Sequence, residues 1–196
     1  MHLEHAILGF LNYVPFTGYD LKRSFESSVR HFWPADQSQI YRTLRRLAEQ
    51  GFVTHEVVQQ EGRPNRKVYR ITEAGRKELR AWIGRTPDPE EVRSPFLIQV
   101  FFAGLLNDDE IIAMLEAKAQ QLRELLDRYR SIADAPLEDE GQEAPPRERF
   151  FWYLTLDNGL SNKQAELDWI EDAMERIRNK EYEQGGRVLP PPRRTR

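Results

Sequence analysis

The stretch "DQSQIYRTLRRLAEQGFVTHEVVQQEGRPNRKVYRIT", residues 36–72, changes its hydrophobic period halfway along. Its first half repeats apolar residues every three or four positions, which predicts an amphipathic helix that stops at Gly51. Its second half, "FVTHEVVQ" and "KVYRIT", is β-branched and roughly alternating, which predicts a hairpin around "QEGRPNR". The expected buried stripe of the helix is Ile40, Leu44, Leu47 and Ala48.

Further helices are predicted on both sides of this stretch. "LEHAILGFLNY" and "TGYDLKRSFESSV" precede it and "EAGRKELRAWI" follows it, each with apolar residues at helical spacing. The order helix, helix, helix, hairpin, helix is that of a winged helix-turn-helix, which we therefore expect over residues 1–84. The expected N-caps, residues whose side chains accept a backbone hydrogen bond, are Thr17, Asp36 and Thr72.

The second half of the chain predicts only helices, in a helical domain over residues 94–182. An acidic linker with prolines, at about residues 134–146, is expected to be flexible, and the tail over residues 183–196 disordered. The last helix, from about Arg147 to Tyr182, keeps an apolar seam over roughly four heptads, which predicts packing against another long helix. The seam consists of Tyr153, Leu156, Leu160, Leu167, Ile170, Met174 and Ile177, with Lys163 among them. The fold class is thus mainly α with a small β-hairpin.

Composition limits the class of protein. The 196 residues include no cysteine, which excludes disulfides, thiol catalysis and Cys-ligated zinc. No apolar run approaches the roughly 20 residues of a membrane span, and the N-terminus lacks signal-peptide features, so we expect a cytoplasmic protein without a membrane partner. Residues 1–84 hold 13 Lys and Arg against 9 Asp and Glu, whereas residues 85–196 hold 16 against 23. The first half is therefore the one expected to meet an anion.

The polar side of the helix in residues 36–50 carries groups that recognise DNA. Gln and Arg side chains read base edges, while Ser, Tyr and a helix N-terminus hold phosphates. An ordinary solvated face is the alternative interpretation, because Arg and Gln are also good helix formers. The adjacent hairpin favours DNA recognition, with this helix in the major groove. The expected contact residues are Gln37, Ser38, Gln39, Tyr41, Arg42 and Arg45.

The hairpin turn "EGRPNRK" concentrates positive charge. Gly62 and Pro64 suit a turn, and charge at a hairpin tip also deters aggregation of a sheet edge. That role explains one or two charges but not a cluster of one sign. We therefore interpret the turn as a wing whose cations neutralise phosphates or enter a minor groove. The expected wing residues are Arg63, Asn65, Arg66 and Lys67.

Other candidate sites have simpler explanations. His2 and His5 lie beside Glu4 at a spacing of three, but a metal needs further ligands, and histidines at a fraying terminus usually have no such role. "NDDE" at 107–110 is explained by acidic side chains in the first turn of a helix. The sequence has no phosphate-cradling or nucleophile-elbow motif. We therefore expect no metal site, no cofactor and no enzymatic activity.

Two aromatic groups, "FLIQVFF" and "RFFWYL", allow two interpretations. They pack against one another in a dimer core, or they line a pocket for a small-molecule effector. The sequence alone identifies no effector-binding residue. The aromatic residues concerned are Phe96, Phe101, Phe102, Phe150, Phe151, Trp152 and Tyr153.

The strings "SQIYRTLRRLAEQGFV" and "GRPNRKVYRITEAGRKEL" resemble the winged-helix domain of the PadR-type transcriptional regulators. "SPFLIQVFFAGLLNDDEIIAMLEAKAQQL" and "FFWYLTLDNGLSNKQAELDWIEDAME" are similar to the helical domain of the longer members. The resemblance reaches about residue 180, apart from the linker. It implies a homodimeric regulator of a pseudo-palindromic DNA operator, often a repressor released by a small, often aromatic ligand. It also implies a phosphate contact for Lys22 and a dimer seam on the last helix.

A protein of another class can share this fold. An adaptor would use the winged domain only as a scaffold for other proteins and would not bind DNA. An RNA-binding protein is a further alternative, although the stacking aromatic residues expected for RNA are missing from the hairpin and the helix before it.

Overall fold

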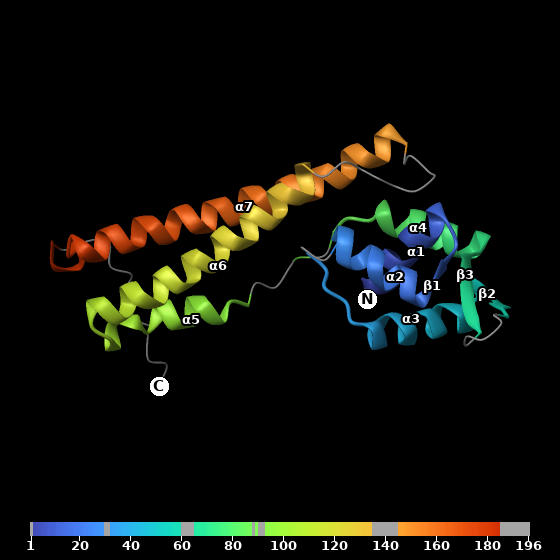
Figure 1. Ribbon diagram of the computed structural model, residues 1–196, viewed down its shortest axis with the longest axis horizontal. Helices are drawn as coiled ribbons and strands as arrows, with labels where there is room; N and C mark the ends of the chain where they lie inside the picture. Colours follow the sequence, from blue (N-terminus) through green and yellow to red (C-terminus); the bar gives the residue numbers. More distant parts are fainter. Residues whose placement is uncertain are drawn as a thin grey trace. The chain divides into compact units, whose positions relative to one another are not determined.

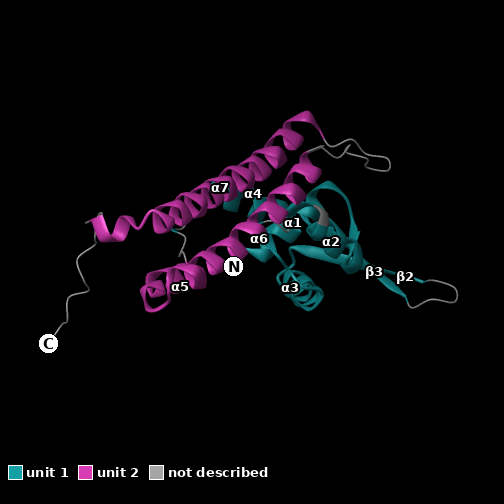
Figure 2. Ribbon diagram, turned by 60° about the vertical axis from the view of Figure 1, so that its left-hand side comes forward, with its two compact units in different colours: residues 1–90 teal, residues 91–196 magenta. Residues whose placement is uncertain are grey.

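The computed structural model describes residues 2–29, 32–59, 65–87, 89, 93–134 and 145–184. The chain divides into two compact units, residues 1–90 and 91–196, which Figure 2 colours separately. The turn of the predicted wing with Arg63, most of the predicted linker, and residues 185–196 of the predicted tail lie outside the described residues. Within the described ranges, no helix is long and apolar enough to cross a membrane.

Unit 1 is a winged helix-turn-helix, as the sequence predicts. In chain order its elements are α1 (Leu3–Tyr13), β1 (Phe16–Thr17), α2 (Gly18–Ser24), a π-helix (Phe25–Val29), α3 (Gln37–Glu49), β2 (Val53–Val58), β3 (Arg66–Ile71) and α4 (Glu73–Ile83). α2 packs on α3, and α1 packs on both α3 and α4 (Figure 1). The strands form one antiparallel sheet in the order β1-β3-β2.

β3 is the central strand of this sheet. One edge pairs with β2, from Val53 opposite Ile71 to Val58 opposite Arg66. The other edge pairs with β1, where Phe16 lies opposite Tyr69. The sequence alone does not reveal β1, because a strand of two residues is too short to show alternation.

Side-chain caps begin α2, α3 and α4 where the sequence predicts them. Thr17 and Asp36 each accept a hydrogen bond from the backbone N–H three residues later, and Asp20 and Gln39 accept one from the N–H of the cap residue. Both helices thus start with a complete capping box. α3 ends before Gly51, whose φ of 73° is the left-handed conformation that glycine adopts without strain.

The second helix departs from its predicted form. An apolar repeat of four residues predicts one α-helix to Val29, but the backbone from Phe25 onward is a π-helix. Ser28 Oγ donates a hydrogen bond to the carbonyl oxygen of Ser24 at 2.5 Å. A serine hydroxyl that bonds to a carbonyl one turn earlier competes with the α-helical hydrogen bonds, which accounts for a wider turn at this point.

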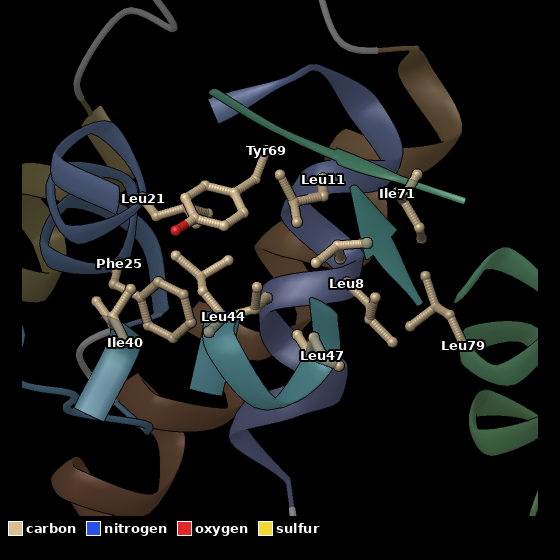
Figure 3. Close-up of a cluster of buried hydrophobic side chains, with 12 residues drawn as sticks. Leu8, Leu11, Leu21, Phe25, Ile40, Leu44, Leu47, Tyr69, Ile71 and Leu79 are labelled. Atoms are coloured by element: carbon tan, nitrogen blue, oxygen red, sulfur yellow. The ribbon is translucent and has the colours of Figure 1, made fainter. Parts of the chain in front are cut away.

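The core of unit 1 fixes α3 by its inner face (Figure 3). Ile40, Leu44 and Leu47 are buried there, as predicted. Ala48 is only half-buried, which corrects the predicted stripe, and Thr43 takes the remaining buried position on that face. The other buried members of this core are Ile7, Leu8, Leu11, Leu21, Phe25, Val53, Tyr69, Ile71 and Leu79.

Unit 2 contains an antiparallel pair of long helices. Its elements are α5 (Pro95–Phe101), a 3-10 helix (Ala103–Leu105), α6 (Asp108–Asp134), α7 (Pro146–Arg178) and a second 3-10 helix (Glu181–Gln184). Arg123 donates a hydrogen bond to Glu171 at 2.7 Å and Arg130 donates one to Gln164 at 3.2 Å. These two pairs fix the antiparallel register of α6 and α7, which lie side by side in Figure 1.

The apolar seam of α7 packs within the chain. It meets another long helix, as the heptad pattern predicts, but that helix is α6 of the same chain. The assignment of Leu167, Ile170 and Met174 to a seam between two copies is therefore wrong, because one chain already buries them against α6. Leu156 is likewise buried within one chain, Leu160 and Ile177 pack on the edge of the same cluster, and Tyr153 stays exposed.

Two helical glycines give a test of the packing in unit 1. A Cβ atom at Gly75 in α4 would lie 2.2 Å from the carbonyl oxygen of Phe52, so we expect Gly75→Ala to lower the free energy of unfolding by about 1–3 kcal/mol. A Cβ atom at Gly9 in α1 would meet nothing within 4 Å, so Gly9→Ala should raise it by about 0.5–1 kcal/mol. Thermal unfolding of the full chain measures both changes. Equal stability of the two variants would contradict the close approach at Gly75.

Candidate nucleic-acid interface

The outward face of α3 carries the polar groups that the sequence singles out. Because a helix turns about 100° per residue, burial of Ile40, Leu44 and their neighbours places Ser38, Arg42 and Arg45 on the opposite side. All the predicted contact residues of this helix are exposed, namely Gln37, Ser38, Gln39, Tyr41, Arg42 and Arg45. The structure thus brings them together on one helix surface. Their side chains differ in whether they form hydrogen bonds with other described residues.

Two of these side chains are engaged at the start of the helix. Ser38 Oγ donates to Asp36 Oδ1 at 2.7 Å, and Gln39 Oε1 accepts a hydrogen bond from the backbone N–H of Asp36 at 3.1 Å. The backbone N–H of Gln39 and the hydroxyl of Ser38 hold the pKa of the Asp36 carboxyl below its ordinary value of 3.8. Asp36 is therefore ionised at neutral pH and keeps its cap. Gln37 is the remaining amide of the first turn.

Adjacent arginines of α3 have different roles. Arg46 forms an ion pair with the carboxylate of Glu4, a buried residue of α1, so it ties α3 to α1. Arg42 and Arg45 have no hydrogen bond or ion pair with any described residue. The sequence "RTLRRL" does not separate these roles, because Glu4 lies far away along the chain. Arg42 and Arg45 are thus the guanidinium groups of α3 that are available to a ligand.

Tyr41 lies on the flank of α3 next to α2. Its ring approaches the backbone of Gly18, the first residue of α2. Burial raises the pKa of the Tyr69 hydroxyl and the neighbouring Tyr41 raises it further, while Arg45 lowers it, so these three side chains lie near one another. Sequence reasoning missed Gly18, because a single glycine at a helix start carries no signal of its own.

The hairpin presents the described wing residues to solvent. Asn65, Arg66 and Lys67 are exposed, and neither Arg66 nor Lys67 pairs with a described acidic group. Arg70, farther along β3, instead donates a hydrogen bond to Glu56 of β2 at 3.0 Å. The free cations of β3 therefore lie toward the turn, and Arg63 belongs to the part of the turn outside the described residues.

Lys22 forms an ion pair with a neighbouring residue. Its Nζ lies 3.5 Å from Glu26 Oε1, four residues later in the π-helix that follows α2. The two residues line a groove between α2 and the start of α3, together with Phe25, Pro34, Ala35, Asp36, Gln37 and Gln39. The carboxylates of Glu26 and Asp36 also line this groove, so the surroundings of Lys22 are less favourable to an anion than those of Arg42 or Arg45.

The N-terminal histidines belong to the packing of unit 1. The His5 ring stacks on Trp82 of α4 at 4.4 Å between centroids, and its Nε2 lies 3.2 Å from Glu78 Oε1. His2 contacts Trp33 edge to face. In the part of the chain that the structure describes, no group of three His, Cys, Asp or Glu side chains is arranged to hold a metal ion.

Among the exposed apolar side chains of unit 2, two groups correspond to the aromatic stretches singled out in the sequence. On α5 and at the residue after it, Leu97, Ile98, Phe101 and Phe102 line a shallow pocket beside Arg93. On the first turns of α7, five consecutive apolar residues are exposed, Phe150, Phe151, Trp152, Tyr153 and Leu154. The two predicted aromatic groups are thus surface features of a single chain, except for Phe96, which packs on the α6–α7 cluster.

Comparison with known proteins gives the family. The model of the transcriptional regulator PadR-like family matches residues 7–81, and that of the virulence activator alpha C-terminal region matches residues 92–178. The negative transcriptional regulator PadR of Bacillus subtilis is 30% identical over 180 residues, which cover 89% of this chain and 97% of that protein.

Solved structures agree with this assignment. B. subtilis PadR in complex with operator DNA matches with a TM-score of 0.78 at 28% identity, over 90% of this chain and 99% of that one. The same protein in complex with p-coumaric acid matches with a TM-score of 0.73 at 27% identity, over 89% and 94%. The chain therefore belongs to the PadR-like family of transcriptional regulators.

Proposed function

We propose that this regulator binds duplex DNA sequence-specifically as a homodimer and represses transcription. The observation that carries the proposal is the pair of unengaged arginines, Arg42 and Arg45, on the outward face of α3. The likeness to a relative solved on operator DNA supports it, and the negative regulation by that relative favours repression. Such a role uses no catalytic site, and we place the protein in the cytoplasm with its DNA.

In this proposal, the side chains of α3 contact bases and those of the hairpin contact phosphates. The guanidinium groups of Arg42 and Arg45 offer paired N–H donors that match O6 and N7 of guanine in the major groove, and the Gln37 amide matches adenine. Arg66 and Lys67 on the exposed hairpin supply charge that neutralises phosphates in any sequence. In this proposal, α3 determines sequence specificity, and the wing contributes to affinity and to the position of the protein along the DNA.

Two arginines of β3 provide the test of DNA binding. The affinity of the wild-type protein for duplex DNA should fall steeply as salt rises. Arg66→Ala should reduce the slope of log K against log salt by about 0.9 for each of the two copies in the dimer, because each copy loses one phosphate contact. Arg70→Ala, on the same strand but paired with Glu56, is the control and should leave the slope unchanged. Fluorescence anisotropy over a salt series measures both.

The same experiment separates the regulator from its alternatives. A protein adaptor on this scaffold would show no duplex binding even at low salt. An RNA-binding protein would prefer single-stranded RNA to duplex DNA in competition. Equal slopes for Arg66→Ala and the wild-type protein would remove the wing from the DNA contact.

Exposed apolar residues of α7 support a homodimer. Arg130 pairs with Gln164, so α6 ends at about the level of residue 160 of α7, and the first turns of α7 run past it (Figure 1). There Phe150 to Leu154 cover every side of the helix with apolar surface, a pattern typical of a buried helix. We infer that a second copy covers this segment. In such a dimer the two α3 helices meet half-sites about one helical turn apart, roughly 34 Å.

The mass of the protein in solution tests this dimer. Light scattering should give twice the 23.1 kDa of one chain. Phe151→Glu places a charge in the inferred interface and should shift the mass to that of one chain, because an unpaired buried charge is costly. Ile83→Glu makes the same change at an exposed apolar residue of unit 1 and should remain dimeric. A dimeric Phe151→Glu protein would place the interface elsewhere.

A small-molecule effector completes the proposal. The relative that binds p-coumaric acid supports a phenolic acid as the first probe for this chain. An effector that binds the DNA-free form more tightly must weaken DNA binding, so p-coumaric acid should raise the Kd for operator DNA. Cyclohexanecarboxylate, an acid without the aromatic ring, is the control. An unchanged Kd at saturating p-coumaric acid would exclude that compound as the effector.

A further inference from the structure

Tyr41 approaches α2 at a separation that only glycine permits. A Cβ atom at Gly18 would lie 2.5 Å from Tyr41 Cε1, 2.6 Å from Cζ and 3.0 Å from the hydroxyl oxygen. The φ angle of Gly18 is not positive, so its backbone conformation suits other residues. Gly18 is needed at this position because of the Tyr41 ring, and not because of the backbone.

The hydroxyl of Tyr41 is available to a ligand. It forms no hydrogen bond with any described residue, and 41% of the residue surface remains exposed. Arg45, which has no ion pair among the described residues, lies one turn along the same helix. A hydroxyl donor beside a guanidinium group is suited to an anionic oxygen, because hydrogen bonds to charged acceptors are shorter and stronger than neutral ones.

We propose that Gly18 is a positioning residue for DNA binding, which holds Tyr41 across the start of α2 so that the tyrosine hydroxyl donates a hydrogen bond to a DNA phosphate. The proposal rests on the proposed DNA-binding function and refines it. Tyr41 lies beside the outward face of α3, so it contributes to affinity in every sequence. Base reading is then left to Gln37, Arg42 and Arg45.

Tyr41→Phe tests the hydroxyl, because it removes one oxygen and keeps the ring on Gly18. We expect the affinity for a duplex selected by the wild-type protein to fall about tenfold for each copy in the dimer, as for the loss of one hydrogen bond to a charged group per copy. The affinity for a scrambled duplex should fall by the same factor. The thermal unfolding midpoint should not change. Tyr182→Phe, which removes a hydroxyl from unit 2, is the control and should bind as the wild-type protein does.

Gly18→Ala tests the positioning. The added methyl group must displace the ring, so the affinity should fall by about the same factor as in Tyr41→Phe. The double variant Gly18→Ala/Tyr41→Phe should bind no more weakly than either single variant, since both changes remove the same contact. In a Tyr41→Ala background, Gly18→Ala should leave the affinity unchanged and should not lower the unfolding midpoint, because no ring remains to be displaced.

Three outcomes would overturn the proposal. Wild-type affinity of Tyr41→Phe would exclude the hydroxyl contact, and losses that add in the double variant would exclude coupling through Gly18. A Tyr41→Phe loss confined to the selected duplex would make Tyr41 a base reader. By contrast, failure of the wild-type protein to bind any duplex would contradict the proposed function itself.

Discussion

Burial of Ile40, Leu44 and Leu47 in the core of unit 1 fixes which way α3 faces. A helix that buries one stripe has no freedom in what it presents on the opposite side. Ser38, Arg42 and Arg45 therefore point away from the core whatever their own preferences. The exposed polar surface of α3 is in this sense a consequence of apolar packing, and its orientation depends on how firmly α3 is held against rotation about its axis.

Polar and steric contacts on the two flanks of α3 restrict this rotation. On one flank Arg46 is anchored to the buried Glu4 of α1, and on the other Tyr41 rests on Gly18 of α2. The core alone tolerates a small rotation, because apolar contacts have no direction. An ion pair to a buried carboxylate and a ring against bare backbone do have direction. Together they hold the arginines in one orientation, which favours recognition without a further loss of entropy on binding.

The features predicted from the sequence are those encoded by neighbouring residues. The burial of Ile40, Leu44 and Leu47 on α3 depends on short-range spacing, and the structure confirms it. The same holds for the caps at Thr17, Asp36 and Thr72 and for the β2–β3 hairpin. β1 was too short to show a period. The pairing of Arg46 with Glu4 joins residues on different helices, and no local pattern encodes it.

The seam of α7 shows a different limit of sequence reasoning. A heptad repeat reports that a helix has a long partner, but it says nothing of whether that partner belongs to the same chain. Here Leu167, Ile170 and Met174 are buried against α6 of the same chain. The site residues on α3 and the wing were named from chemistry and exposure, and their contacts with DNA remain predictions.

In the proposed dimer, the use of the seam within the chain has a consequence for regulation. The surface left for a second copy is the aromatic start of α7, which is smaller than the whole helix. Two winged helix-turn-helix units joined in one dimer bind an operator far more tightly than one unit binds a half-site, because the second contact forms at a high effective concentration. An effector that alters the packing of the start of α7 changes this gain in operator affinity without contacting Arg42 or Arg45. Control of operator affinity is then exerted through unit 2, while the choice of sequence stays with α3.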